Sequence, residues 1–246
     1  MFITTRGLVL REVKYKEADK ILTILTEDEG KITVRARGAL RKGCRYSAAT
    51  QLLTFSEMTL FHNHGRWSLN EGSTVEQFLG IRNDLTGFAL GTYFAELLEA
   101  VSDEDEPNPA LLSLGLNALF ALSRKLYPPE HIKAVFELRL ACLAGFAPAL
   151  DGCSVCGTTV PEHPWFSTDG GVLCCSECRP TVGAGLPLCA ASLAAMVHVT
   201  HAAPKKIFSF TLDEVGAARF HAVSEAYILS QLDRGFGGLD YWKRVR

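Results

Sequence analysis

Two pairs of cysteines are the residues whose type and spacing most clearly predict chemistry. Cys153-Ser-Val-Cys156 and Cys175-Ser-Glu-Cys178 are C-x-x-C pairs with eighteen residues between them, a spacing typical of a four-cysteine zinc site. Each pair presents two thiolates from one tight turn, and two such turns complete a tetrahedron around Zn²⁺. We expect the zinc to be structural, because four thiolates leave no open position for catalysis.

The identity of the third zinc ligand stays open at this point. Cys174 stands directly before Cys175 and could take its place, although the spacing favours Cys175. A thioredoxin-type redox pair is the alternative to zinc. It needs a C-x-x-C at a strand-to-helix junction of a βαβ unit, and the sequence before Cys153 does not predict such a unit.

The chain is expected to be cytosolic. No stretch reaches the roughly 20 apolar residues that cross a bilayer, and the first twenty residues mix charges among the apolar side chains. The eight cysteines therefore favour metal binding over disulfides, because thiols stay reduced in that compartment.

A basic segment, Lys31 to Arg45, carries six cations and no acid in a chain of formal net charge −2. Ile32, Val34 and Ala36 alternate in it with polar and charged residues, which predicts a strand with one apolar and one cationic face. Such a face is suited to a polyanion, and nucleic acid is the first candidate. The alternative is a solvated strand whose cations deter aggregation.

The first 80 residues are expected to form a small barrel that positions this basic segment. Five strand-like runs lie at residues 3–13, 20–26, 31–37, 52–61 and 66–76. Five short strands are typical of the OB-fold, whose face and loops hold oligonucleotides. Residues 1–50 carry eleven cations against six acids, so the barrel is the cationic end of the molecule.

From Asp84 onward the apolar period becomes helical. Helices are expected at about 84–101, 109–126, 130–146, 188–201 and 213–234, with Asp213 as an N-cap. The prediction is a multidomain α+β protein with an OB-fold barrel (1–80), a helical bundle domain in two parts (81–150 and 183–246) and an inserted four-cysteine zinc finger (151–182). The sequence carries no phosphate-binding glycine loop and no dinucleotide fingerprint, so an enzyme is not expected.

Four segments in this order give the chain a family resemblance. They are residues 4–32, the basic residues 36–61, the cysteine segment 153–178 and the ending DRGFGGLDYWKRVR. Together they resemble the bacterial RecO family of recombination mediators. The resemblance implies a location in the bacterial cytoplasm, with association with the nucleoid when the protein is bound to DNA. The resemblance implies binding of single- and double-stranded DNA, annealing of complementary strands, and assistance to RecA loading on DNA coated by single-strand binding protein (SSB), together with RecR. The second cysteine in LCCSEC departs from the family pattern.

The resemblance also implies residue roles. DNA-binding cations map onto Arg35, Arg37, Arg41, Lys42 and Arg45, with Lys14, Lys16 and Lys20 as weaker candidates. Relatives bind the acidic C-terminal tail of SSB through the helical domain. Cations that could contact such a tail are Arg139, Lys205 and Lys206, and the terminal Lys243, Arg244 and Arg246, of which Lys205 and Lys206 are favoured. A zinc-ribbon adaptor that binds protein, without a direct nucleic-acid function, is the competing hypothesis.

Overall fold

The computed structural model describes residues 1–159 and 161–246, which form two compact units. The N-terminal unit comprises residues 1–124 together with 236–246. The cysteine-containing unit comprises residues 125–235. Segments from the two ends of the sequence thus build the N-terminal unit.

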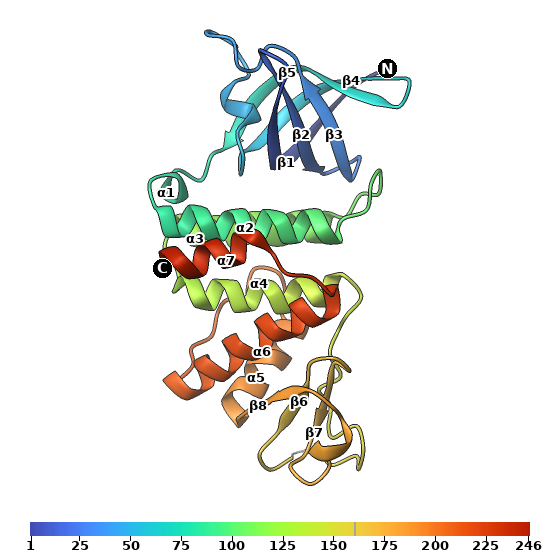
Figure 1. The fold of residues 1–246 in the computed structure, drawn as a ribbon, viewed down its shortest axis with the longest axis vertical. Helices are drawn as coiled ribbons and strands as arrows, with labels where there is room; N and C mark the ends of the chain where they lie inside the picture. Colours follow the sequence, from blue (N-terminus) through green and yellow to red (C-terminus); the bar gives the residue numbers. More distant parts are fainter. Residues whose placement is uncertain (160) are drawn as a thin grey trace. The chain divides into compact units, whose positions relative to one another are not determined.

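A closed five-stranded barrel begins the N-terminal unit (Figure 1). Its strands are β1 (Phe2–Tyr15), β2 (Asp19–Thr26), β3 (Lys31–Ala36), β4 (Phe55–Asn63) and β5 (Arg66–Glu76). They neighbour one another in the order β1-β2-β3-β5-β4, β1 also pairs with β4, and the β3–β5 pair is parallel. This is the OB-fold that the sequence predicts.

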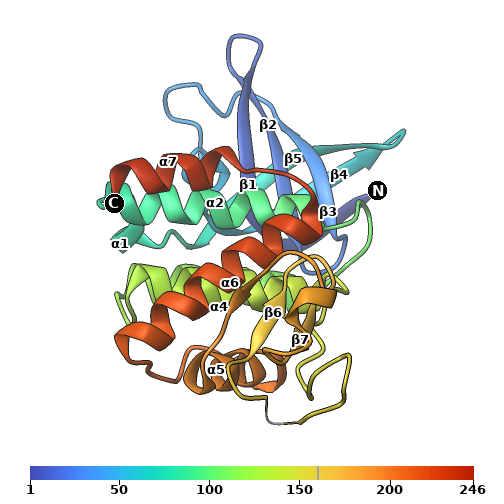
Figure 2. The same cartoon turned by 60° about the horizontal axis from the view of Figure 1, so that its bottom comes forward.

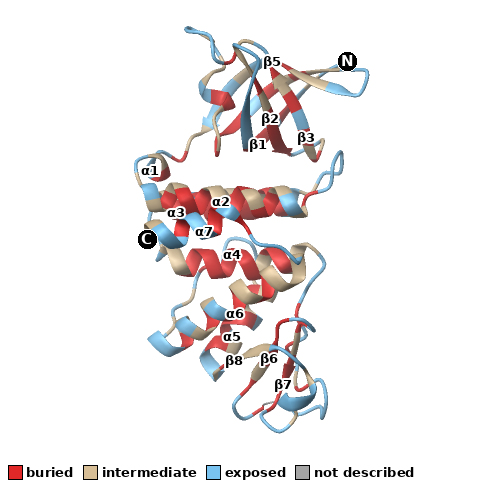
Figure 3. Ribbon diagram, in the orientation of Figure 1, coloured by how far each residue is buried: buried red, intermediate tan, exposed pale blue. Residues whose placement is uncertain are grey.

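The barrel interior is filled by the alternating apolar residues of its strands. In β3, Ile32, Val34 and Ala36 are buried while Thr33 is exposed, which confirms the alternation expected for the basic segment. Figure 3 shows buried stretches in red along the barrel strands. Full burial of an aliphatic side chain stabilises the fold by about 2 kcal/mol, so the core fixes which face of β3 carries the cations.

The turn between β2 and β3 connects the barrel to the helices of the same unit. Gly30 has a φ of +67°, and a Cβ there would lie 2.4 Å from the backbone of Glu106. Lys31 donates from Nζ to the carbonyl of Glu99 (3.0 Å), and Arg11 pairs with the Glu99 carboxylate (3.1 Å). Lys31 and Arg11 therefore both attach the barrel to Glu99, in the helical part of the same unit.

Four helices complete the N-terminal unit, namely α1 (Leu79–Arg82), α2 (Leu85–Val101), α3 (Pro109–Ser123) and α7 (Gly237–Val245). The Asp84 carboxylate caps α2 by accepting from the N–H groups of Thr86 and Gly87. α7 lies alongside α2 in both views (Figures 1 and 2). Gly238 permits this approach, since a Cβ there would lie 2.9 Å from the Tyr93 Cα.

The cysteine-containing unit holds the remaining helices and a small sheet. Its helices are α4 (Pro129–Leu143), α5 (Ala190–His201) and α6 (Glu214–Leu232), and its strands are β6 (Trp165–Ser167), β7 (Val172–Cys174) and β8 (Gly185–Pro187). Two 3₁₀ turns, Ala48–Thr50 in the barrel and Arg179–Thr181 beside the sheet, complete the described elements. α4 packs on α5 and α6, and Asp213 caps α6 as predicted by accepting from Gly216 N–H (2.9 Å).

The two compact units do not coincide with the predicted domain boundaries. The sequence assigns residues 81–150 and 183–246 to one helical domain, whereas α2, α3 and α7 lie in one unit and α4, α5 and α6 in the other. The predicted four-part division stays a prediction. The described helices are all too short or too polar to span a bilayer.

A buried ion-pair network joins α4 to α6. Lys133 donates to Glu137 (2.8 Å) and to Glu225 (2.7 Å), and the Glu137 side chain is fully buried. Removing one member of such a network leaves an uncompensated charge in a low-dielectric interior.

Replacement of this lysine tests the network. We expect Lys133→Met to lower the free energy of unfolding by about 3–5 kcal/mol, because Glu137 keeps its buried charge without its cation. Urea denaturation of the full chain, followed by far-UV circular dichroism, measures the loss. Lys205→Met, at an exposed position, is the matched control and should change stability by less than about 0.5 kcal/mol. Equal effects of the two variants would contradict the assignment.

Candidate nucleic-acid interface and metal centre

Two backbone turns present the four predicted cysteine ligands. In the first turn, Cys153 N–H donates to Thr158 O (2.8 Å) and Gly157 N–H donates to Cys153 O (2.9 Å), with Gly157 at a φ of +76°. Ser154 N–H donates to Leu173 O (2.8 Å), which fastens this turn to β7. The second pair follows β7 directly, so the sheet positions both turns.

The four thiols converge on one point. The Sγ atoms of Cys153, Cys156, Cys175 and Cys178 all lie within 4.8 Å of one another, and those of Cys156 and Cys175 are 3.8 Å apart. A Zn–S bond of about 2.3 Å in a tetrahedron requires S···S distances of about 3.8 Å. The donor set and its spacing therefore fit a tetrahedral thiolate-bound metal ion.

Cys174 lies outside this cluster of four thiols. It ends β7, pairs in register with Trp165 of β6 and is fully buried. Burial raises the pKa of its thiol, and its Sγ is not one of the four that converge. The structure thus brings Cys175 to the centre and places Cys174 in the small core beneath it.

Thiol ionisation within the cluster is uneven. A hydrogen bond from the Cys156 backbone N–H lowers the pKa of Cys153 to about 6. The neighbouring thiols, that of Cys175 first, raise the pKa of Cys178. A dication at the centre offsets the mutual repulsion of four thiolates and stabilises their ionised form.

The barrel uses two of the eight predicted DNA-binding cations in ion pairs of its own. Lys20 is buried, pairs with Glu12 and also donates to Thr50 O (3.3 Å). Arg35 donates from Nε and Nη2 to Asp19 Oδ2 at 3.0 and 2.7 Å. Lys20 therefore has no face for a phosphate, and the charge of Arg35 is largely neutralised.

Asp19 also anchors the basic loop that follows β3, which spans residues 37–46. Its Oδ1 accepts from Gly38 N–H (2.8 Å), and Leu40 N–H donates to Ala18 O (2.9 Å). The Gly38 hydrogen bond, followed by Arg35, lowers the pKa of Asp19 below its ordinary value of 3.8. The loop is thus pinned to the β1–β2 hairpin by a carboxylate that stays ionised.

The remaining loop cations stand in solvent. Arg37, Arg41, Lys42 and Arg45 are exposed, and within the part of the chain that the structure describes none has a carboxylate at ion-pair distance. Lys14 and Lys16 are exposed on the β1–β2 hairpin beside them. The structure therefore separates cations that stabilise the barrel from cations that remain available to a ligand.

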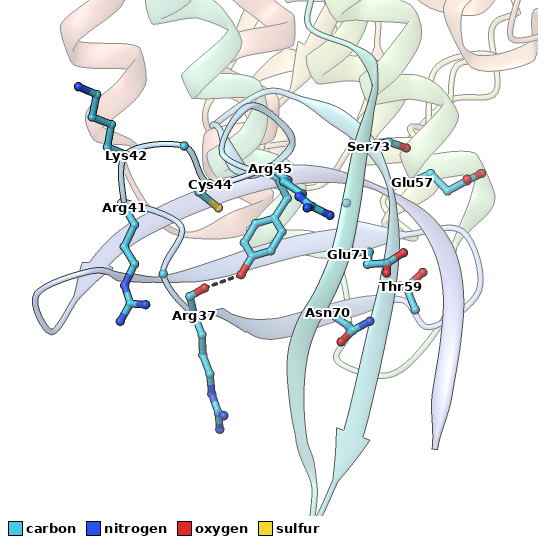
Figure 4. Close-up of a pocket in the computed structure, with 14 residues that line it drawn as sticks. Arg37, Arg41, Lys42, Cys44, Arg45, Glu57, Thr59, Asn70, Glu71 and Ser73 are labelled. Carbon is cyan, nitrogen blue, oxygen red and sulfur yellow. Dashed lines mark hydrogen bonds between the residues drawn. The ribbon is translucent and has the colours of Figure 1, made fainter.

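A hollow of about 740 Å³ opens beside the basic loop. We call it the loop hollow; it is lined by Arg37, Gly38, Arg41, Lys42, Gly43, Cys44, Arg45, Tyr46, Glu57, Thr59, Asn70, Glu71, Gly72 and Ser73. Figure 4 shows the loop cations along one wall and Glu57 and Glu71 along the other. The Tyr46 hydroxyl donates to the Arg37 carbonyl and so braces the loop.

Sequence reasoning missed a cation on the neighbouring face of the barrel. Arg66, exposed at the start of β5, lines a second hollow together with Arg35 and Arg37. In the sequence, Arg66 is marked only by its position directly after the His62–Gly65 turn. It could not be assigned to the basic surface from that signal, because the pairing of β5 with β3 is what brings it near the basic segment.

Three of the predicted partner-binding cations differ in their surroundings. Arg139 is half-buried and donates to the carbonyls of Val199 (3.1 Å) and Thr200 (2.6 Å) at the end of α5. Lys205 and Lys206 are exposed in the turn that follows α5. Arg139 thus serves the helix end, while the two lysines face solvent.

These features define a multidomain α+β protein with an N-terminal OB-fold barrel, a helical region and a four-cysteine cluster. Family models match the same organisation: "Recombination protein O N terminal" covers residues 1–78, and "Recombination protein O C terminal" covers residues 82–240. The chain belongs to the RecO family of DNA repair and recombination mediators, as the sequence motifs indicated. Members of this family are not enzymes, which agrees with the expectation from the sequence that the protein is not an enzyme.

Individual relatives support this membership. The chain is 34% identical over 247 residues to a DNA repair protein RecO of Acetivibrio thermocellus, covering 99% of this chain and 97% of the relative. It is 34% identical to one from Listeria monocytogenes serotype 4b, covering 68% of this chain and 66% of the relative. A third, from Exiguobacterium sibiricum, is 36% identical and covers 71% and 70%.

The cysteine geometry gives a test of the ligand set. We expect Cys156→Ser and Cys175→Ser to release the metal, and Cys174→Ser to retain it, because Cys174 lies in the core rather than at the centre. Elemental analysis of freshly purified protein measures metal content, and proteolysis around residues 150–180 reports local unfolding. Metal loss in Cys174→Ser with retention in Cys175→Ser would reverse the assignment.

Proposed function

We propose that this protein binds single- and double-stranded DNA through the barrel, anneals complementary strands, and with RecR assists RecA loading on SSB-coated DNA. Membership of the RecO family of DNA repair and recombination mediators supports this proposal. The observation that carries the proposal is the group of four exposed loop cations, Arg37, Arg41, Lys42 and Arg45, for which the described residues offer no carboxylate at ion-pair distance. Phosphate contacts by such cations give affinity that does not depend on sequence.

Annealing follows from charge neutralisation. Two complementary strands repel each other through their phosphates, and a cationic surface that contacts both backbones reduces that repulsion. No nucleotide hydrolysis is needed for this step. The exposed cations of the loop and of the β1–β2 hairpin supply positive charge on adjoining segments.

We propose Zn²⁺ as the resident metal and a structural role for it. Four thiolates in a tetrahedron are a donor set that zinc prefers. Cys153, Cys156, Cys175 and Cys178 would hold the ion and thereby tie the two turns to the small sheet. The DNA contacts lie in the barrel, so the metal would support the cysteine-containing unit rather than touch DNA.

Salt dependence tests the phosphate contacts. If the four loop cations each neutralise one phosphate, log affinity for a single strand falls against log salt with a slope of about −3. Arg41→Gln with Lys42→Gln should reduce the slope by about 1.4, since two contacts are lost. Fluorescence anisotropy at several salt concentrations measures it.

Arg6→Gln with Arg11→Gln is the matched control, because both arginines belong to the barrel but pair with Glu57 and Glu99. This control should change the slope less. An equal change in both variants would contradict the loop assignment. Absence of any salt-dependent DNA binding by the intact protein would favour the protein-binding adaptor instead.

The SSB tail is expected to contact Lys205 and Lys206. These lysines are exposed, whereas Arg139 is held by the end of α5, so we exclude Arg139 from the proposed contact. Acidic tails bind where cations stand beside apolar surface.

Lys205→Glu with Lys206→Glu should weaken binding of a labelled tail peptide at least about tenfold. Lys125→Glu, on another segment, serves as the control. Unchanged anisotropy titrations in the lysine variant would remove this site.

A further inference from the structure

A second hollow, of about 730 Å³, lies on the outer face of the barrel. We call it the aromatic hollow; it is lined by Tyr15, Ile21, Thr33, Arg35, Arg37, Phe61, Asn63, His64, Gly65, Arg66, Trp67 and Ser68. These residues come from all five strands, from the β4–β5 turn and, in the case of Arg37, from the basic loop after β3. Of the described residues that line it, three are arginines and none carries a carboxylate, in contrast to the loop hollow with its two glutamates.

Aromatic rings in this hollow are partly exposed and held in place. Tyr15 is 41% exposed, and the Arg35 guanidinium lies 5.3 Å from the centre of its ring. Trp67 packs one side on the barrel core, and the His62 ring lies 4.4 Å from it at 36°. The Arg35–Asp19 pair fixes the guanidinium beside Tyr15. The Lys16 ammonium also lies 5.5 Å from the centre of the Tyr15 ring. The rings of the hollow are thus held in place before a ligand arrives, and a base would take the position of one of these neighbouring side chains.

This combination of rings and cations suits an unstacked nucleobase. Every base has a π-face that stacks on an aromatic ring, and each nucleotide of a strand also carries a phosphate that arginine can bind. A duplex hides its base faces within the stack, so it cannot use such rings without opening. An acidic or purely apolar peptide would use the arginines or the rings, but not both together.

Arg37 lines both hollows. A backbone held by the loop cations can therefore continue past Arg37 into the aromatic hollow, where its next base meets the rings. The two hollows would then have different tasks, one for phosphates of any strand and one for exposed bases.

We propose that the aromatic hollow is a base-stacking subsite for single-stranded nucleic acid, in which Tyr15 and Trp67 hold an unstacked base, the Asp19-paired Arg35 positions Tyr15, and Arg37 and Arg66 face the backbone of the strand. This inference rests on the proposed DNA-binding function. It makes the aromatic hollow the part of the barrel that distinguishes single-stranded from double-stranded DNA.

The test compares three ligands of equal length with the full chain. They are a fluorescent oligothymidylate of about 12 nucleotides, the same backbone without bases, and a duplex. Tyr15→Leu and Trp67→Leu should each weaken oligothymidylate binding about tenfold, and should leave the abasic strand and the duplex unchanged. Tyr241→Leu, which removes an exposed ring from α7, should change none of the three.

A fold defect is separated from a site defect by two further measurements. Trp67 packs on the core, so thermal denaturation checks that variant, and Tyr15→Leu, at an exposed position, decides the matter if Trp67→Leu does not fold. In wild-type protein, oligothymidylate should quench a fluorescence component that Trp67→Leu lacks, and the abasic strand should not.

Three outcomes carry different conclusions. Unchanged oligothymidylate affinity in Tyr15→Leu, or equal losses on the abasic strand, would overturn base stacking while leaving the phosphate-binding role intact. An effect of Arg41→Gln with Lys42→Gln on all three ligands supports that role. If the wild-type protein binds none of the three ligands, the proposed function itself fails.

Discussion

The Asp19 carboxylate is the contact on which the cationic surface of the barrel depends. One oxygen accepts from the Arg35 guanidinium and the other from the Gly38 backbone N–H. The first contact holds the Arg35 guanidinium 5.3 Å from the centre of the Tyr15 ring, and the second fixes the start of the basic loop. A loop with several like charges would otherwise spread apart. One anion thus makes a dense group of cations compatible with an ordered backbone.

The barrel divides its positive charge into two groups through burial and pairing. Arg11 and Lys31 join the barrel to α2, while Lys20 is buried against Glu12. The loop residues keep their charge for solvent or for a ligand. A count of cations along the sequence overstates the number that can reach a phosphate, because ion pairs between strands are invisible to it.

Local patterns predicted the elements well where the physical signal is itself local. Ile32, Val34 and Ala36 revealed the buried face of β3, Asp213 the start of α6, and the C-x-x-C spacing the cluster of four thiols. Spacing favoured Cys175 over Cys174 but left the choice open, because the choice depends on which way a strand end faces.

The features that sequence reasoning could not assemble all depend on residues distant in the sequence. The aromatic hollow needs β3 to pair with β5, a contact between Val34 and Trp67. α7 is short and begins with glycines, so its propensity is weak. It becomes stable where Gly238 and Trp242 pack in the N-terminal unit. Neither signal is present in a window of ten residues.

The contact between Gly238 and Glu96 spans 142 residues of sequence. A ribosome therefore completes the whole cysteine-containing unit before it makes the helix that covers α2. Until then, the α2 surface beside Tyr93 remains uncovered, even though the barrel strands have already been synthesised. The N-terminal unit is thus the first to begin folding and the last to be completed. Its final step is the docking of α7 on α2, which closes a long loop of chain at a cost in entropy.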